Sequence, residues 1–363
     1  MAFFQIFTDY YSYMIAFLLA FVISLASTPL SMKIAYKVGA LDKPKKRGMH
    51  SKIMPRAGGL AIFTGFIITV LFLMYHVAES QRITIWGLLL GATIITSLGF
   101  IDDIYGLRPR TRIVVQLIAA LIAVMTGTRI SDITIPLLGT IEFGIFSNVI
   151  TVFWIIGVTN AVNLLDGLDG LATGVASIAC TTLMIIAVIF GDPMLAGLPI
   201  LLTAALAGSC LGFLPYNFNP AKIFMGDTGS TFLGYSLAVI SIQTMLKTYT
   251  AMTLVVAVIV LALPIGDTLF AIIRRTANRR PISEADRGHL HHRLIDKGLS
   301  HKKAVLTLYF VSGLFGLAAI LIVIKDAWVA VIILCLVFGI WIFDNLRHHR
   351  QEKRNRETES EEI

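Results

Sequence analysis

Four polar side chains, Asn160, Asn163, Asp166 and Asp169, recur at every third position between two apolar stretches of the chain. A charged side chain at the centre of a membrane helix costs about 2.5–3.5 kcal/mol, so carboxylates in this setting indicate a functional site. On a helix, a spacing of three turns the side-chain direction by about 60° per step, and Gly167 then ends the helix and leaves Asp169 in a loop. Amides beside carboxylates can orient metal ligands and read the edge of a base. We assign Asn163 to a metal or phosphate, and Asp166 and Asp169 to a nucleotide. A polar contact between helices is the alternative.

Further carboxylates lie at two other boundaries between polar and apolar sequence. Asp102 and Asp103 are adjacent, and two such groups repel each other unless a cation or a basic neighbour is present. They predict a site for a divalent metal or a phosphate, with a solvated acidic loop as the alternative. Asp227 lies among small residues in Gly226-Asp-Thr-Gly-Ser230, just before an apolar segment. Glycine lets backbone N–H groups approach a ligand, and the following helix N-terminus favours anions. This carboxylate is an oxygen ligand of the kind that Mg²⁺ prefers. An ordinary helix N-cap is the alternative.

A basic loop at residues 274–303 carries histidines and several arginines. Three histidines can bind zinc, but the loop has no cysteine and its arginines disfavour a second cation. We therefore favour a clamp for phosphate and sugar over a metal site. Asp267, in the preceding apolar segment, either orients this loop or satisfies a polar neighbour, and the sequence does not choose between these roles. The residues assigned to phosphate or sugar are His289, His291, His292, Arg293, Lys46, Arg56 and Arg112.

The elements that must position these residues are membrane helices. The chain has 363 residues, a mean hydropathy of +0.80 and only 14% charged residues, whereas soluble domains carry about 25%. Its apolar windows have the length of a transmembrane helix. We predict an all-α polytopic membrane protein, with a single integral membrane domain at 1–346 and a charged cytoplasmic tail at 347–363. About eleven spans are expected, at roughly 9–30, 57–75, 84–101, 113–127, 148–165, 171–191, 195–213, 229–246, 251–273, 304–324 and 327–344.

Lysine and arginine predict the orientation of the bundle. Of the 30 Lys and Arg residues, 26 lie in segments 31–56, 102–112, 214–228, 274–303 and 345–363. The positive-inside rule puts these segments in the cytoplasm, the N-terminus outside and the C-terminus in the cytoplasm. All the polar clusters then fall on the cytoplasmic side.

The remaining features fit the same class of protein. The net charge of +8 reflects topology and attraction to anionic lipid, and no platform for nucleic acid is visible. A short external hairpin is predicted near 128–146. Cys180, Cys210 and Cys335 lie in apolar segments and are expected as small core residues.

The clusters, taken in order, resemble the polyprenyl-phosphate N-acetylhexosamine-1-phosphate transferases. Within that superfamily the chain is most similar to the bacterial undecaprenyl-phosphate GlcNAc-1-phosphate transferases that start wall teichoic acid or other surface polysaccharides. It differs from the phospho-MurNAc-pentapeptide transferases, which carry a Lys where this chain has Gly106 and a run of three histidines where it has His289-Leu-His-His. The motifs that carry the resemblance are Pro55-Arg-x-Gly-Gly, Asp102-Asp103, Asn160-x-x-Asn163-x-x-Asp166-Gly-x-Asp169-Gly, Phe224-Met-Gly-Asp227-Thr-Gly-Ser and His289-x-His291-His292-Arg.

The resemblance implies an activity and a set of partners. UDP-GlcNAc and undecaprenyl phosphate would give UMP and undecaprenyl-pyrophosphoryl-GlcNAc at the cytoplasmic face of the bacterial plasma membrane. Mg²⁺ is the implied cofactor, with Mn²⁺ as an alternative, and a homodimer is left open. The implied catalytic and metal-binding residues are Asp102, Asp103, Asp227 and Asn163, and the implied nucleotide-binding residues are Asn160, Asp166, Asp169 and Phe224.

The reaction brings an anionic phosphate to an anionic diphosphate, so positioning and neutralisation of charge should dominate catalysis. A phosphate monoester with a second pKa near 6 is already mostly deprotonated at neutral pH. We therefore expect Asp102 and Asp103 to position Mg²⁺ or its waters rather than to abstract a proton. The alternatives are a phospho-MurNAc-pentapeptide transferase and, in a different class, a carrier of nucleotide sugars or lipids. A carrier is expected to hold its charges near the membrane centre.

Overall fold

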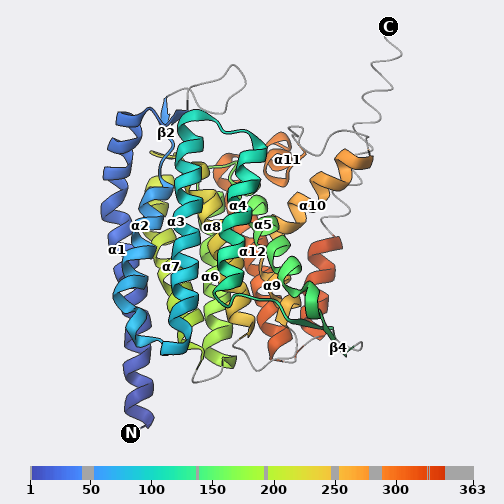
Figure 1. Cartoon of the computed structure of the whole chain (residues 1–363). Helices are drawn as coiled ribbons and strands as arrows, with labels where there is room; N and C mark the ends of the chain where they lie inside the picture. The colour runs from blue at the N-terminus through green and yellow to red at the C-terminus, as the bar shows by residue number, and fades with distance from the viewer. Residues whose placement is uncertain are drawn as a thin grey trace.

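The computed structural model describes residues 2–42, 53–135, 139–191, 195–246, 253–277, 288–324, 326 and 328–339. It is a bundle of roughly parallel and antiparallel helices, and it contains two short hairpins at opposite ends (Figure 1). In chain order, the first five α-helices are α1 (Ala2–Val38), α2 (Gly59–Leu73), α3 (Arg82–Tyr105), α4 (Pro109–Met125) and α5 (Ser147–Leu165). They continue with α6 (Leu171–Phe190), α7 (Gly197–Asn217), α8 (Gly226–Leu246), α9 (Thr253–Val260), α10 (Ala262–Ala277), α11 (Leu290–Asp296) and α12 (His301–Val323).

Seven helices in the described part of the chain are long and apolar enough to cross a membrane. They coincide with seven of the predicted spans, so the prediction of an all-α multi-pass membrane protein is confirmed. The count of eleven and the orientation stay predictions. The seven segments are Tyr11–Val38, Gly59–His76, Glu79–Tyr105, Gly144–Leu165, Leu171–Phe190, Gly197–Asn217 and His301–Val323.

The other predicted spans take different forms. The span at 113–127 is the 17-residue helix α4, and the span at 229–246 is α8, whose sequence holds several polar residues. The span at 251–273 is divided into α9 and α10 at Leu261. Pro264 explains the division, because its ring nitrogen cannot donate to the carbonyl of Val260. The last span appears as the helix Trp328–Gly339.

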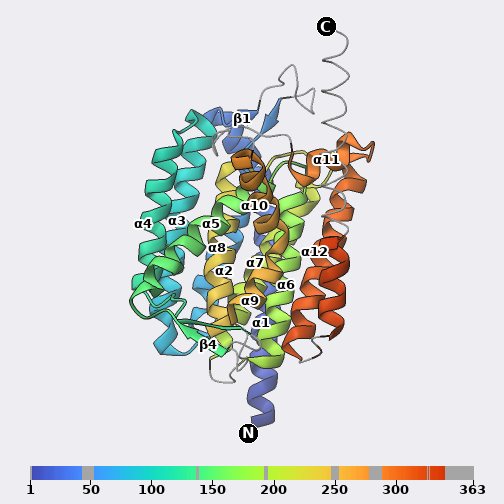
Figure 2. The same ribbon diagram turned by 90° about the vertical axis from the view of Figure 1, so that its right-hand side faces the viewer.

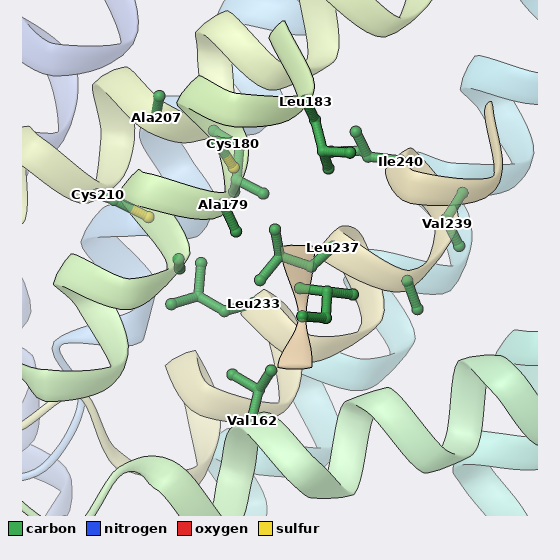
Figure 3. Close-up of a cluster of buried hydrophobic side chains, with 14 of the residues drawn as sticks. Val162, Ala179, Cys180, Leu183, Ala207, Cys210, Leu233, Leu237, Val239 and Ile240 are labelled. Carbon is green, nitrogen blue, oxygen red and sulfur yellow. The ribbon is translucent and has the colours of Figure 1, made fainter. Parts of the chain in front are cut away.

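Two helices, α7 and α8, form the centre of the bundle. α7 packs against α1, α2 and α6, and α8 packs against α3 and α5. Their apolar side chains interlock with those of α6, as seen around Leu183 and Leu237 (Figure 3). Cys180 and Cys210 lie in this core, as predicted, but Cys335 is exposed on the helix Trp328–Gly339 and is not a core residue.

Small residues allow the central helices to approach closely, as is common in membrane bundles. A Cβ on Gly59 of α2 would lie 2.1 Å from the backbone nitrogen of Gly229 in α8. A Cβ on Gly99 of α3 would lie 2.4 Å from the carbonyl oxygen of Asp227. These two contacts bring the start of α8 against both α2 and α3.

The two hairpins lie at opposite ends of the bundle (Figures 1 and 2). β1 (Leu41–Asp42) pairs with β2 (Met54–Pro55), and β3 (Asp132–Ile135) pairs with β4 (Gly139–Glu142). The second pair confirms the hairpin predicted near 128–146. The first pair lies at the same end as α11 and the start of α8, and we call this the site end of the bundle.

Candidate active site

The site begins where α3 meets α8. The carboxylate of Asp103 accepts hydrogen bonds from the backbone N–H of Asp227 (2.9 Å), the backbone N–H of Thr228 (2.9 Å) and the hydroxyl of Thr228 (2.6 Å). These donors belong to the first turn of α8, where backbone N–H groups have no partner within the helix. Gly226, at φ +72°, starts this turn, and a Cβ there would lie 2.4 Å from Asp103. Asp103 is therefore the cap of α8, supplied by another helix.

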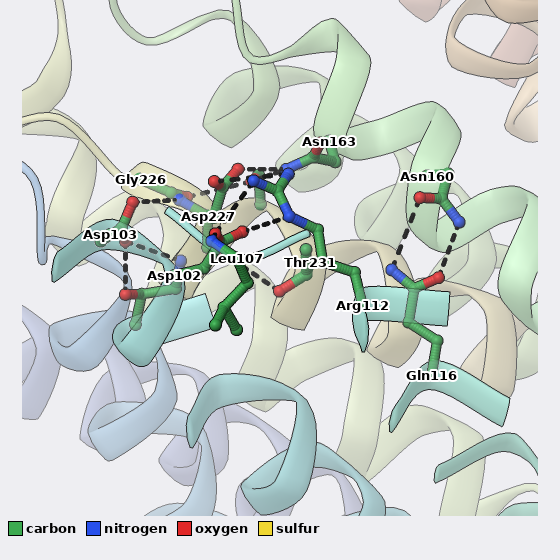
Figure 4. Close-up of polar contacts among 12 residues, drawn as sticks. Asp102, Asp103, Leu107, Arg112, Gln116, Asn160, Asn163, Gly226, Asp227 and Thr231 are labelled. Carbon is green, nitrogen blue, oxygen red and sulfur yellow. Dashed lines mark hydrogen bonds and ion pairs between the residues drawn. The ribbon is translucent and has the colours of Figure 1, made fainter. Parts of the chain in front are cut away.

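Two arginines balance the carboxylates around this cap. Arg112 forms a bidentate contact with Asp102, at 2.6 Å through Nε and 2.9 Å through Nη2 (Figure 4). Its Nη1 lies 3.9 Å from Asp227. Arg56 lies 3.3 Å from Asp103 and 3.7 Å from Asp227. Burial alone would lower the pKa of Arg56, but Asp103, Asp227 and nearby carboxylates outweigh it and raise that pKa. The Arg56 guanidinium therefore stays charged beside these carboxylates.

Asp227 lies between the two arginines and is the partly exposed member of the group. Its carboxylate accepts a hydrogen bond from the amide of Asn163 (2.7 Å), and that amide also donates to the hydroxyl of Ser230 (2.8 Å). Asp102 and Asp227 share Arg112 as an ion-pair partner. The predicted grouping of Asp102, Asp227 and Asn163 is thus present in the structure.

Asp102 and Asp103, which the sequence predicts to position a metal or its waters, are both buried but have different partners. Asp103 is held by α8 and lies near Arg56, whereas Asp102 contacts Arg112. In the described part of the chain, no three His, Cys, Asp or Glu side chains form a group that could hold a metal by themselves.

A polar pocket of about 300 Å³, open to solvent, lies beside this cluster. Arg56 is held at this pocket because the backbone N–H of Phe224 donates to the carbonyl of Pro55 and the backbone N–H of Gly58 donates to the carbonyl of Phe224. The lining residues are Asp42, Arg56, Asp166, Gly167, Leu168, Asp169, Asn217, Phe224, Met225, Gly226 and His301. Three of the four residues assigned to the nucleotide, Asp166, Asp169 and Phe224, therefore share one pocket.

The two aspartates of this pocket differ in their partners. Asp169 accepts hydrogen bonds from the Asn219 amide (3.0 Å) and the Ala221 backbone N–H (3.1 Å), so it fixes the turn after α7. Asp166 has no hydrogen-bond donor for its carboxylate among the described residues. Burial and the charge of Asp227 raise the pKa of Asp166 to about 7, against the opposing effect of Arg56. Asp166 is the acidic group of the pocket that is most available to a ligand.

Asn160 lies apart from the pocket that holds the other three. Its amide donates to the Gln116 side chain (2.8 Å) and to the carbonyl of Ile156 (2.8 Å), which joins α5 to α4 (Figure 4). Three residues along a helix change the side-chain direction by about 60°, so Asn160 and Asn163 of α5 face different neighbours. The polar contact between helices, named above as the alternative, describes Asn160.

The histidine segment approaches the pocket through His291. A Cβ on Gly167 would lie 2.1 Å from Nε2 of His291, so the ring rests against the loop between Asp166 and Asp169 that lines the pocket. Burial, His292 and His289 lower the pKa of His291 to about 3, although Asp267 opposes them. His291 is therefore a neutral ring at physiological pH, and its part in a phosphate and sugar clamp stays a prediction. His289 and Arg293 are also buried.

Several predicted residues are placed elsewhere or were missed. Lys46 lies outside the described residues. Asp42 and His301 line the pocket although nothing in their sequence context marked them. His301 begins α12 and is far along the chain from the other lining residues, so only the fold brings it there.

Comparisons with known proteins identify the family. Residues 85–245 match the model described as glycosyl transferase family 4. The chain is 42% identical over 330 residues to a "probable undecaprenyl-phosphate N-acetylglucosaminyl 1-phosphate transferase" of Bacillus subtilis, covering 89% of this chain and 90% of that protein. It is 35% identical to a decaprenyl-phosphate N-acetylglucosaminephosphotransferase of Mycobacterium tuberculosis, covering 83% of this chain and 80% of that protein.

A more distant group is also recognisable. The chain is 31% identical to a phospho-N-acetylmuramoyl-pentapeptide-transferase of Desulforamulus reducens, covering 85% of this chain and 93% of that protein. The matches to these three relatives extend over most of the chain. The chain therefore belongs to glycosyl transferase family 4, as a multi-pass membrane enzyme that transfers a phosphosugar to a polyprenyl phosphate.

Proposed function

We propose that the protein transfers GlcNAc-1-phosphate from UDP-GlcNAc to undecaprenyl phosphate, releasing UMP, at the cytoplasmic face of the bacterial plasma membrane. The observation that carries this proposal is the group Asp102, Asp227 and Asn163, held between Arg56 and Arg112 beside a polar pocket. The name of the Bacillus subtilis relative supports the sugar and the lipid. The product would feed teichoic acid or another surface polysaccharide.

The site end of the bundle is the proposed cytoplasmic face. Arg56, Arg112 and the histidine segment all belong to stretches that hold most of the Lys and Arg residues, and such stretches are retained in the cytoplasm. A polyprenyl tail stays in the hydrocarbon while its phosphate lies at the level of the headgroups. A site at the helix ends can therefore meet both a lipid phosphate and a soluble nucleotide sugar.

The donor set fits Mg²⁺. This ion is usually held by one or two carboxylates together with substrate phosphates. Asp227 is a partly exposed carboxylate beside the amide of Asn163, and Asp102 shares Arg112 with it. Mn²⁺ would be accepted by the same oxygens. When bound there, the metal would supply charge for the phosphate oxygens.

The residues of the chain would perform the positioning. Two unit charges 4 Å apart repel by about 4 kcal/mol at an effective dielectric of 20, so two anionic substrates need neutralisation. Arg56 and Arg112 lie near enough to Asp227 to act on a phosphate there. Asp102 is occupied by Arg112 and by the backbone N–H of Leu107 (2.5 Å), which favours a positioning role over proton abstraction. We propose direct attack by the lipid phosphate.

The test is the release of UMP by the purified full-length protein in lipid nanodiscs. The proposal expects UMP only when UDP-GlcNAc, undecaprenyl phosphate and Mg²⁺ are all present, together with a lipid-linked pyrophosphoryl sugar. Turnover restricted to UDP-MurNAc-pentapeptide would replace the proposed donor. Transport of intact nucleotide sugar without cleavage would favour a carrier and overturn the proposal.

A further inference from the structure

Asp267, on α10, makes two polar contacts with the start of α11. Its side chain is buried, with one oxygen 2.8 Å from Nδ1 of His289 and the other accepting the backbone N–H of Leu290 (2.9 Å). His289 is the residue before α11, and Leu290 is the first residue of that helix. One carboxylate thus holds both the side chain and the backbone at the start of α11.

This contact lies at the start of a short helix. α11 has seven residues, and helices this short are not stable on their own. Leu290 and Leu294 pack against the apolar core and also border an apolar pocket between α10 and α12. Because apolar packing has no preferred direction, the two hydrogen bonds to Asp267 add a directed contact that fixes how the helix starts.

Another face of α11 lies behind the wall of the polar pocket. His291 rests against Gly167, which lines that pocket next to Asp166. The His289 and His291 rings are nearly parallel with centroids 5.9 Å apart, and the His291 and His292 ring centroids are 4.3 Å apart. A shift at His289 would therefore be passed to the ring that supports Gly167.

The contact also selects one form of the His289 ring. A carboxylate accepts hydrogen bonds but cannot donate them, so Nδ1 of His289 must carry the hydrogen that lies toward Asp267. In the neutral ring this leaves Nε2 as the acceptor nitrogen. A partner that fixes the tautomer of a histidine can matter greatly to activity, as in carboxylate–histidine pairs of other enzymes.

We propose that Asp267 is a positioning residue of the donor pocket, which sets the tautomer of His289 and seats α11 so that His291 supports the pocket-lining loop at Gly167. The inference rests on the proposed function. Asp267 does not line the polar pocket, so it acts through His289 and α11 rather than by touching substrate.

The experiment compares Asp267→Asn, Asp267→Ala and the wild type as full-length proteins in nanodiscs. Asn retains one oxygen for the N–H of Leu290, but its amide presents hydrogens to Nδ1 and so favours the other tautomer of His289. Ala removes both contacts. The matched control is Asp296→Asn, which makes the same chemical change on the exposed end of α11.

Two measurements are made on each protein. The first is the ¹⁵N NMR spectrum of ¹⁵N-histidine-labelled protein, with His289 assigned from a His289→Gln sample, because protonated and unprotonated ring nitrogens give separate signals. The second is kcat and donor KM from UMP release. The NMR spectrum needs no substrate, so failure of the proposed function does not prevent the test of the tautomer.

We expect Asp267→Asn to exchange the His289 tautomer and to lower kcat/KM by about tenfold to a hundredfold, a loss typical of partners that orient a functional histidine. Asp267→Ala should in addition raise the donor KM, because α11 is then free to move. Asp296→Asn should match the wild type in both measurements. An unchanged His289 tautomer in Asp267→Asn would overturn the inference. So would kinetics within twofold of the wild type in both Asp267 variants, and thermal melting identifies any loss that comes from misfolding.

Discussion

Two neighbouring groups of acidic residues in this molecule are built in opposite ways. At the contact between α3 and α8, Asp103 is fully buried and accepts hydrogen bonds from the first turn of α8, with Arg56 beside it. In the adjacent pocket, Asp166 is partly exposed and has no hydrogen-bond donor among the described residues. Asp227 lies between them, bonded on one side and open on the other. The difference separates carboxylates that build the site from those that are left for a ligand.

Asp227→Asn tests a carboxylate that is left for a ligand, and it should have the largest effect on activity. The amide keeps the shape but removes a charge from the pair with Asp102, so a cation would lose a ligand. We expect kcat to fall by about a thousandfold, the size of effect seen when one central electrostatic group is removed from an active site. UMP release measures the loss. A thermal melting temperature equal to that of the wild type would show that the fold is intact, and activity within tenfold of the wild type would contradict the assignment.

Asp103→Asn tests the buried carboxylate that holds the start of α8. Asn keeps one acceptor oxygen, so its NH2 group would face the N–H of either Asp227 or Thr228, and Arg56 would lose its nearest charged partner. Removing one partner of a buried pair costs about 3–5 kcal/mol, so the melting temperature should fall by several degrees. Thermal unfolding in nanodiscs measures this, with Asp227→Asn as the matched variant. If Asp103→Asn melted like the wild type, Asp103 would not be the cap that holds α8.

Asp166→Asn sharpens the comparison through pH. The pKa of Asp166 is raised to about 7 in the folded protein, above its value of about 4 in an unfolded chain. The group therefore favours folding most below pH 4, and this contribution is lost as the pH rises through 7. Relative to the wild type, Asp166→Asn should melt higher at pH 8, by about 2 °C, and the difference should shrink toward pH 5. Melting curves at these two pH values test it, and a difference that grew toward pH 5 would contradict the stated pKa.

Asn160→Leu should have the smallest effect. Its contacts with Gln116 and Ile156 join two helices away from the pocket, and such polar contacts in membrane proteins contribute about 0.6 kcal/mol. We expect a donor KM within about twofold of the wild type and a small decrease in melting temperature. Gln116→Leu is the matched change on the other helix. A large increase in donor KM for Asn160→Leu alone would restore the nucleotide role predicted from the sequence.

The sequence was sufficient for the class of fold and for the main polar groups. Continuous apolar windows gave seven of the long helices directly, because a helix surrounded by lipid must be apolar along its length. It did not distinguish Asp102 from Asp103, since adjacent residues on a helix point in different directions and only the position of α8 decides which one caps that helix. It also could not find His301, because the approach of α12 to the loop at Asp166 depends on packing between distant segments.

The most direct test of the account is a titration of the protein with Mn²⁺, observed by electron paramagnetic resonance in nanodiscs with UMP present. The account predicts one Mn²⁺ site that Mg²⁺ displaces, that Asp227→Asn abolishes, and that remains in Asp103→Asn wherever that variant is folded. Mn²⁺ binding in Asp227→Asn equal to that of the wild type would contradict the central claim that Asp227 is the carboxylate left open for a cation.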